Sequence, residues 1–168
     1  VPMSDEVKML GPDLPAWMHE HRVSYFDPTP TLLRMMGDVD VARDVPHLRV
    51  VHAGGEAISQ HLVDRWAASD TCVLVNGYGP TEVAITCMQQ RLHAGGPVVI
   101  GKPTLLCQAW VVDHTKPDLP VVPDGTQGEL CISGPQVTRG YLNLPDRTAQ
   151  SFVHHPVIGR MYRTGDLV

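Results

Sequence analysis

Residues 48–82 read LRVVHAGGEAISQHLVDRWAASDTCVLVNGYGPTE. Two short apolar runs in this stretch, residues 48–51 and 72–75, each lead into a glycine-containing segment, which is typical of buried strands. Between them Ser59 can cap a helix whose apolar side lies within residues 62–66. A strand, a helix and a second strand within about 30 residues predict a parallel crossover unit of right-handed sense.

The segments on either side extend this pattern in two different ways. Upstream, residues 12–36 predict a helix, a short strand and a second helix that begins at the Pro28/Pro30 break. Downstream of Gly95, short strand-like runs alternate with turn residues, and only residues 147–153 indicate a helix. We therefore expect an α/β fold, with parallel α/β layers in residues 1–103. A mostly antiparallel lobe resembling a small distorted β-barrel is expected in residues 104–168, within the same domain.

Composition limits the classes of function. The chain has 168 residues, 43% of them hydrophobic and 18% charged, and a net charge of −5. The basic side chains are scattered, so nucleic acid is not an expected partner. No apolar run approaches the roughly 20 residues of a membrane-crossing helix, and residues 1–6 show no secretory signal. A cytoplasmic location without membrane association is the expectation.

Cysteine and histidine usage points to no metal or disulfide framework. The cysteines are widely spaced and mostly lie in apolar runs, so we expect buried, reduced thiols at Cys72, Cys87, Cys107 and Cys131. The neighbouring histidine pairs, at residues 19 and 21 and at residues 154 and 155, lack the spacing that places metal ligands on one helix face. No transition metal is predicted.

The run Asn-Gly-Tyr-Gly-Pro-Thr-Glu, residues 76–82, follows the strand of residues 72–75. Ligands of parallel α/β sheets bind at the carboxyl ends of strands. Tyr78 offers a flat ring for a base, Thr81 a hydroxyl for a phosphate oxygen, and Glu82 a hard oxygen ligand for magnesium. The run therefore favours a nucleoside triphosphate site, and the alternative is a glycine-rich turn that carries a surface Tyr and Glu.

Two further phrases accompany this run. Gly-Glu-Leu-Cys-Ile-Ser-Gly occupies residues 128–134 and is followed by Thr-Arg-Gly-Tyr-Leu at residues 138–142, and Tyr-Arg-Thr-Gly-Asp-Leu occupies residues 162–167. Together with residues 76–82, they resemble, in the same order, the motifs of adenylate-forming enzymes. Residues 48–56 also resemble the strand and loop that precede the adenine site, so the resemblance covers nearly the whole chain. It is greater to the amino-acid-activating adenylation domains of nonribosomal peptide synthetases than to acyl-CoA ligases.

The resemblance implies the large N-terminal subdomain of an adenylate-forming enzyme and assigns roles to particular residues. Asp166 matches the ribose-binding position, where a carboxylate can accept hydrogen bonds from two adjacent hydroxyls; taken alone, it reads as a solvated turn aspartate. Thr81 and Glu82 are implied as catalytic, with Glu82 binding magnesium. The implied contacts to ATP come from Gly55, Asn76, Gly77, Tyr78, Gly79, Thr81 and Asp166.

The positions that select the substrate side chain are also implied by the resemblance. They fall on Asp27, Val51, Ala53, Gly77, Ile85 and Thr86, a mostly apolar set with one carboxylate. If Asp27 is buried, it needs a partner, which a lysine-like or related diamino acid would supply. The alternative is that Asp27 caps the helix that starts near Pro28.

The resemblance implies that an amino acid and ATP form an aminoacyl-adenylate and pyrophosphate. The acyl group then passes to a phosphopantetheine thiol on a peptidyl carrier domain, alongside other synthetase modules, in secondary metabolite biosynthesis. The family's phosphate loop ending in Lys-Gly, its amine-binding aspartate and its C-terminal lysine do not occur in these 168 residues. We therefore expect a partial chain that is inactive by itself. Alternatives are an acyl- or aryl-CoA ligase, a carboxylic-acid-reductase relative, and a nucleotide-binding module without catalysis.

Overall fold

The computed structural model describes residues 3–168. Val1 and Pro2, which open the stretch considered for a secretory signal, lie outside these residues. The chain forms two compact units: the first comprises Val1–Gly77 and Gln89–Gly101, and the second comprises Tyr78–Met88 and Lys102–Val168. The predicted α/β class is confirmed. The division at residue 103, which concerns the subdomains of the whole domain, stays a prediction.

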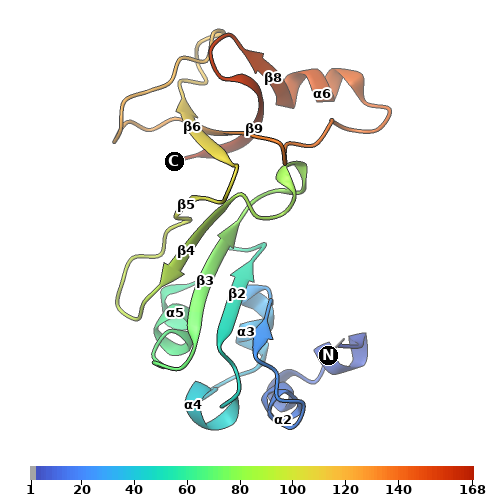
Figure 1. Ribbon diagram of the computed structural model, residues 1–168, viewed down its shortest axis with the longest axis vertical. Coiled ribbons are helices and arrows are strands. Elements are labelled where there is room, and N and C mark those ends of the chain that lie inside the picture. Colours follow the sequence, from blue (N-terminus) through green and yellow to red (C-terminus); the bar gives the residue numbers. More distant parts are fainter. Residues whose placement is uncertain (1–2) are drawn as a thin grey trace. The chain divides into compact units, whose positions relative to one another are not determined.

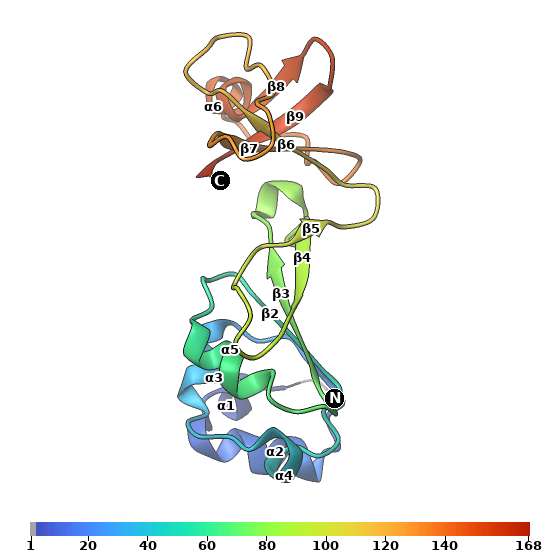
Figure 2. The same cartoon turned by 90° about the vertical axis from the view of Figure 1, so that its left-hand side faces the viewer.

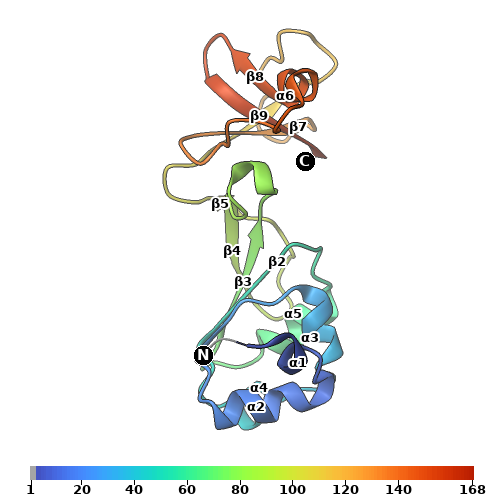
Figure 3. The same cartoon turned by 90° about the vertical axis from the view of Figure 1, so that its right-hand side faces the viewer.

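The first unit contains a sheet with helices, and the first three strands of this sheet are parallel (Figure 1). Its strands are β1 (Tyr25–Phe26), β2 (Val50–Gly54), β3 (Val73–Tyr78) and β4 (Met88–Leu92). Its helices are α1 (Asp5–Lys8), the 3-10 turn η1 (Gly11–Asp13), α2 (Leu14–Glu20), α3 (Pro30–Met35), α4 (Val41–Asp44) and α5 (Gln60–Trp66). Strand β2 pairs in parallel with both β1 and β3, so the predicted strand, helix and strand are confirmed. Helices α3 and α5 lie on the same face of β2 and β3 (Figures 2 and 3).

Two hydroxyl side chains start the helices that cover this sheet. The Ser59 Oγ accepts a hydrogen bond from the Leu62 backbone N–H at 3.4 Å, which is the predicted cap of α5. Helix α3 is capped by Thr29, whose Oγ1 accepts from the Leu32 N–H at 3.3 Å. The alternative that Asp27 caps this helix is therefore wrong, because the extended residue just before the helix is Thr29.

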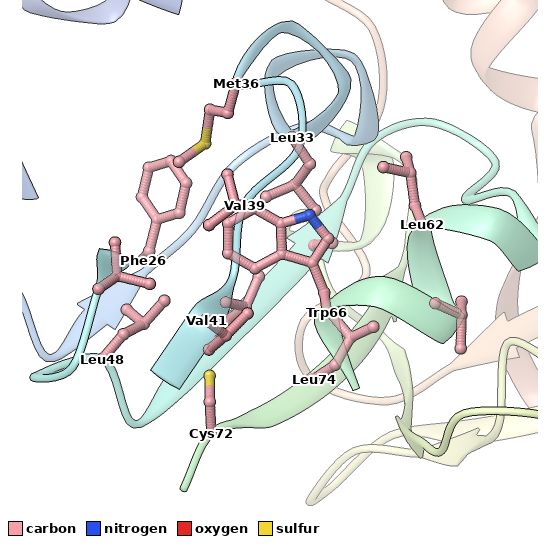
Figure 4. Packing of buried hydrophobic residues seen from close by; sticks show 14 of the residues in the cluster. Phe26, Leu33, Met36, Val39, Val41, Leu48, Leu62, Trp66, Cys72 and Leu74 are labelled. Atoms are coloured by element: carbon pink, nitrogen blue, oxygen red, sulfur yellow. The ribbon is translucent and has the colours of Figure 1, made fainter. Parts of the chain in front are cut away.

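The core of the first unit fills the space between the sheet and its helices (Figure 4). Strand β2 alternates strictly, so that Val51 and Ala53 are fully buried among the helices while His52 points to the other face. This is the period-2 pattern of a strand with one covered face. The largest buried side chain is Trp66 of α5, which packs with the apolar residues of α3 and β3, including Leu33 and Leu74.

The second unit is an antiparallel sheet with one helix. Its elements are the 3-10 turn η2 (Thr81–Val83), β5 (Lys102–Pro103), β6 (Gln108–Val112), β7 (Glu129–Ser133), α6 (Pro145–Ser151), β8 (Phe152–His155) and β9 (Gly159–Leu167). The strand order β6-β7-β9-β8 is antiparallel throughout, as predicted. Within residues 3–168 the sheet is open, with β6 and β8 at its edges, so the lobe does not close into a barrel.

The helix predicted over residues 147–153 is displaced toward the N-terminus. Helix α6 begins at Pro145, a favoured first residue because its missing N–H would have no partner there. The last two residues of the predicted helix, Phe152 and Val153, instead begin β8 and pair with β9. Pairing with a distant strand thus overrides the local helical pattern.

The predicted buried, unpaired thiols are found at all four positions, Cys72, Cys87, Cys107 and Cys131. Cys131 belongs to the core of the second unit, together with Val112, Leu119 and Met161. No helix among the described residues has the length and apolar character needed to cross a bilayer.

Candidate functional site

Tyr78 and Asp166 meet within the second unit. Tyr78 is the last residue of β3, Asp166 lies 88 residues later in β9, and the phenol donates a hydrogen bond to Asp166 Oδ2. Burial, and then the neighbouring carboxylate, raise the pKa of the Tyr78 phenol far above its usual value. The phenol therefore remains protonated and acts as the donor. The first and third of the sequence phrases thus come together in space.

The local backbone fixes the Asp166 carboxylate. The Asp166 N–H donates to Thr164 Oγ1 at 3.1 Å, and the same hydroxyl donates to the Leu130 carbonyl at 2.7 Å. Gly165 has a φ of 78°, in the left-handed region. Asp166 therefore does not lie in a free turn, which corrects the reading of this residue taken alone. Residues 164–166 form an irregularity inside β9, where the pairing register with β7 shifts between Glu129 and Cys131.

Glu129, in the second phrase, holds the third phrase in place. Its buried Oε2 accepts from Arg163 Nε at 3.0 Å and from Nη2 at 2.6 Å, and its Oε1 accepts from the Gly165 N–H at 3.1 Å. The hydrogen bonds that Arg163 donates to Glu129 raise the pKa of the Arg163 guanidinium. Because both Glu129 oxygens accept hydrogen bonds, these contacts offset the cost of burying the charged carboxylate. They also fix the geometry of the strand beside Asp166.

The loop that follows β3 turns tightly because Gly79 has no side chain. A Cβ at Gly79 would lie 2.5 Å from the Ile85 carbonyl oxygen and 2.8 Å from the Cys87 backbone nitrogen. After η2 the chain passes through two left-handed residues, Ala84 with φ 61° and Ile85 with φ 74°. The Thr81 side chain is exposed on this loop, and Ile85 is 74% exposed.

Glu82 is engaged by a residue of the second phrase. The Tyr141 hydroxyl donates to Glu82 Oε1 at 2.6 Å. This hydrogen bond is the main reason why the pKa of the Glu82 carboxyl lies below its usual value, and Tyr162 and the charge of Arg147 act in the same direction. Glu82 is therefore an ionised, partly buried carboxylate, which is the ligand type that magnesium prefers.

The described residues contain no cluster of three or more His, Cys, Asp or Glu side chains suited to a metal. Magnesium commonly uses only one or two protein carboxylates and completes its shell with phosphate oxygens and water. A single carboxylate at Glu82 is the donor set that such a phosphate-bound ion would use.

A polar pair lies on the open face of the first unit. The His52 Nδ1 is 3.3 Å from Asp27 Oδ1, and the two side chains are 17% and 60% exposed. A Cβ at Gly77 would lie 2.7 Å from His52 Cε1 and Nε2, so the ring occupies space that any side chain there would take. The structure thus brings Asp27 and Gly77 together around His52, a residue that the sequence interpretation missed.

Val51 and Ala53 are not part of that group. Both are fully buried in the core on the opposite face, since neighbours along a strand point to opposite sides. Strict alternation through residues 50–54 was the signal that could have identified His52. Ile85 and Thr86 belong to the second unit.

Two other candidate nucleotide contacts lie in the first unit. Asn76 is buried and its Nδ2 donates to the Val99 carbonyl at 2.9 Å, so it fixes the end of β3. Gly55 is exposed just after β2 and has a φ of 82°. The resemblance implies that both residues contact ATP, which stays a prediction, and the contact that the structure shows for the Asn76 side chain is to the Val99 backbone.

A comparison with family models matches residues 2–142 to the family described as AMP-binding enzyme. The chain belongs to the AMP-binding enzyme family. The chain is 38% identical over 155 residues to delta-poly-L-ornithine synthetase of Acinetobacter baumannii, and the match covers 89% of the chain and 11% of that protein. It is 32% identical over 164 residues to bacitracin synthase 3 of Bacillus licheniformis, covering 96% of the chain and 2% of that protein.

Solved structures of nonribosomal peptide synthetases share the fold of this chain. The four-domain synthetase holo-AB3403, solved with AMP and glycine, superimposes with a TM-score of 0.87 at 28% identity, covering 99% of this chain and 12% of that one. The synthetase FmoA3 (S1046A), solved with AMPPNP, gives 0.82 at 30% identity, covering 93% and 18%. The chain therefore spans only a small part of the proteins it matches.

Proposed function

We propose that this chain is part of an ATP-dependent, amino-acid-activating domain of a nonribosomal peptide synthetase. The observation that carries the proposal is the hydrogen bond from Tyr78 to Asp166, which joins the proposed adenine and ribose contacts within one unit. Membership of the AMP-binding enzyme family supports it. So does the likeness to synthetases solved with AMP and glycine or with AMPPNP.

In the proposed reaction a carboxylate oxygen of the amino acid attacks the α-phosphorus of ATP. The bond from that phosphorus to the bridging oxygen breaks, which gives an aminoacyl-adenylate and releases pyrophosphate. The protein supplies positioning and charge stabilisation, so no covalent nucleophile is required. The activated acyl group then passes to the phosphopantetheine thiol of a peptidyl carrier domain in the same synthetase.

Tyr78 and Asp166 together fit the nucleoside. The Tyr78 ring offers a stacking surface for adenine, while its hydroxyl orients the Asp166 carboxylate. A carboxylate has about four acceptor sites, and Tyr78 uses one of them. The others can accept hydrogen bonds from both ribose hydroxyls.

Thr81 and Glu82 fit the phosphates. The exposed Thr81 hydroxyl can donate to a phosphate oxygen, and the ionised Glu82 carboxylate would hold magnesium. When bound, magnesium neutralises charge on the phosphate oxygens. The resemblance also assigns contacts to ATP to Gly55, Asn76, Gly77 and Gly79, and these stay part of the proposal.

For the amino-acid side chain we propose polar contacts at Asp27, His52 and Gly77 of the first unit. The resemblance also assigns side-chain selection to Ile85 and Thr86, and they stay part of the proposal. Val51 and Ala53 support the contacts of the first unit from the core side, since their side chains are buried there. Asp27 is 60% exposed and lies beside His52, so the condition that it is buried and unpartnered is not met. A lysine-like or related diamino acid stays our proposed substrate class because the Asp27 carboxylate can still pair with a cationic side chain. One relative is named a poly-L-ornithine synthetase, which accords with that class.

The test is amino-acid-dependent exchange of pyrophosphate into ATP by the intact protein that contains this chain, with a panel of amino acids that includes lysine and ornithine. Glu82→Gln is expected to reduce exchange about a hundredfold or more. Asp166→Asn is expected to weaken the binding of ATP about tenfold. The matched control Asp124→Asn changes an exposed acid of the same unit and should leave exchange unchanged. Exchange that depends on an acid without an amine would contradict the proposal and favour an acyl- or aryl-CoA ligase.

A further inference from the structure

Tyr141 makes a contact that its sequence phrase does not explain. Its hydroxyl lies 2.6 Å from Glu82 Oε1, although the two residues are 59 positions apart in the chain. Both residues belong to the second unit. A hydrogen bond to an ionised carboxylate is about twice as strong as one between neutral groups, so this contact constrains the Glu82 side chain.

The backbone around Tyr141 is fixed at two further points. The Thr138 N–H donates to the Glu82 carbonyl oxygen at 2.8 Å, so the same segment holds both the backbone and the side chain of Glu82. The Tyr141 N–H donates to Thr148 Oγ1 at 2.9 Å. A Cβ at Gly140 would lie 2.4 Å from Thr148 Cγ2, so glycine allows the segment to approach α6 closely.

The Tyr141 ring is also packed. It makes an edge contact with Phe152, with ring centroids 5.5 Å apart, and the Arg147 guanidinium lies 5.0 Å from the Tyr141 ring centroid. Phe152 in turn packs against Tyr162, with centroids 5.0 Å apart. The hydroxyl therefore projects toward Glu82 from a ring whose own position is set by its neighbours.

We propose that Tyr141 is a positioning residue for adenylation, whose hydroxyl holds the Glu82 carboxylate in the orientation that phosphate-bound magnesium requires. This inference rests on the proposed function, in which Glu82 serves magnesium. Tyr141 touches no substrate in this role and acts only through Glu82. Its removal should therefore affect steps that involve magnesium and spare those that do not.

The test uses Tyr141→Phe in the intact protein, which removes the hydroxyl and keeps the packed ring. Binding of AMPPNP is measured by calorimetry with magnesium and again with a chelator. The variant is expected to bind AMPPNP on the order of tenfold more weakly with magnesium and equally well without it. In pyrophosphate exchange, more magnesium should be needed for half-maximal rate, while the KM for the amino acid stays unchanged.

The control Tyr25→Phe deletes the same hydroxyl from an exposed tyrosine of the first unit and should leave the magnesium dependence unchanged. If Tyr141 only stabilises the fold, Tyr141→Phe will lower the melting temperature and weaken AMPPNP binding equally with magnesium and with the chelator. That result would overturn the inference. Glu82→Asp provides an independent variant, because it keeps the charge but shortens the reach toward Tyr141. It should show the same magnesium-specific loss, and normal magnesium dependence in both variants would also overturn the inference.

A double-variant cycle separates this inference from the function on which it rests. In a Glu82→Gln background, Tyr141→Phe should cause no further loss of magnesium-dependent AMPPNP binding, since Tyr141 acts through Glu82. If the intact protein shows no amino-acid-dependent exchange at all, the proposed function fails. If exchange depends on Glu82 but Tyr141→Phe has wild-type magnesium dependence, only the inference about Tyr141 fails.

Discussion

Replacing Gly79 by alanine should damage the loop that carries Thr81 and Glu82, for a steric reason. The added Cβ would lie 2.5 Å from the Ile85 carbonyl oxygen, 2.8 Å from the Cys87 nitrogen and 2.9 Å from the Ile85 carbonyl carbon. All three atoms belong to the backbone, so no side-chain rotation relieves the overlap. The Cys87 N–H also donates to the Tyr78 carbonyl at 2.9 Å, and that hydrogen bond spans the crowded point.

The magnitude follows from these contacts. Overpacking of this kind costs about 1–3 kcal/mol, and loss of one backbone hydrogen bond costs about 1 kcal/mol more. We expect Gly79→Ala to lower the free energy of unfolding by about 2–4 kcal/mol. Urea denaturation of the intact protein, followed by a probe in the second unit, measures this change. AMPPNP affinity with magnesium should fall as well, because the displaced loop carries the proposed phosphate contacts.

Gly125→Ala is the matched control. Gly125 is an exposed glycine of the same unit with a φ of 81°, and a Cβ there would have no neighbour within 4 Å. Its substitution carries only the left-handed penalty of roughly 1–2 kcal/mol and should leave AMPPNP binding intact. If Gly79→Ala proves no more destabilising than Gly125→Ala and binds AMPPNP normally, the steric reasoning about this loop is wrong.

Three further predictions concern the remaining parts of the site and core. Gly77→Ala should displace the His52 ring, because the new Cβ would lie 2.7 Å from it, and should change the amino-acid preference in pyrophosphate exchange more than the affinity for AMPPNP. Tyr78→Phe keeps the stacking ring but removes the donor to Asp166, so AMPPNP affinity should fall by about twofold to tenfold, measured by calorimetry. Burial raises the pKa of the Cys87 thiol to about 12, so a thiol reagent should label it at neutral pH only after denaturation.

The sequence predicted the parts of the fold whose signals are local. Residues 48–75 contain two apolar runs and a capping Ser59, and these give β2, α5 and β3 as expected. Helix α4 was missed because it has no apolar stripe: Asp40 caps its start, and Val41 is its one buried residue. Phe152 was misassigned to a helix because its strand conformation depends on pairing with β9. Short elements with little apolar burial, and those fixed by distant partners, leave weak local signals.

The candidate site shows the same limit. Residue chemistry suggested Tyr78 and Glu82, whereas Asp166 was implied only by the resemblance, because taken alone it reads as a solvated turn aspartate. The hydrogen bond between Tyr141 and Glu82 joins residues 59 positions apart, and no local pattern encodes it. His52 was within reach of the alternation rule, since a strand that buries Val51 must turn residue 52 to the other face.

The sequence phrases are linked physically as well as by their order in the chain. Each carboxylate proposed to act on the nucleotide is held by a phenol from another phrase: Asp166 by Tyr78 and Glu82 by Tyr141. Glu129 adds a third link, because it holds the Gly165 backbone next to Asp166. Donors already in place before the ligand arrives lower the reorganisation needed during the reaction. A substitution in one phrase should therefore impair the function assigned to another, which a model of independent motifs does not predict.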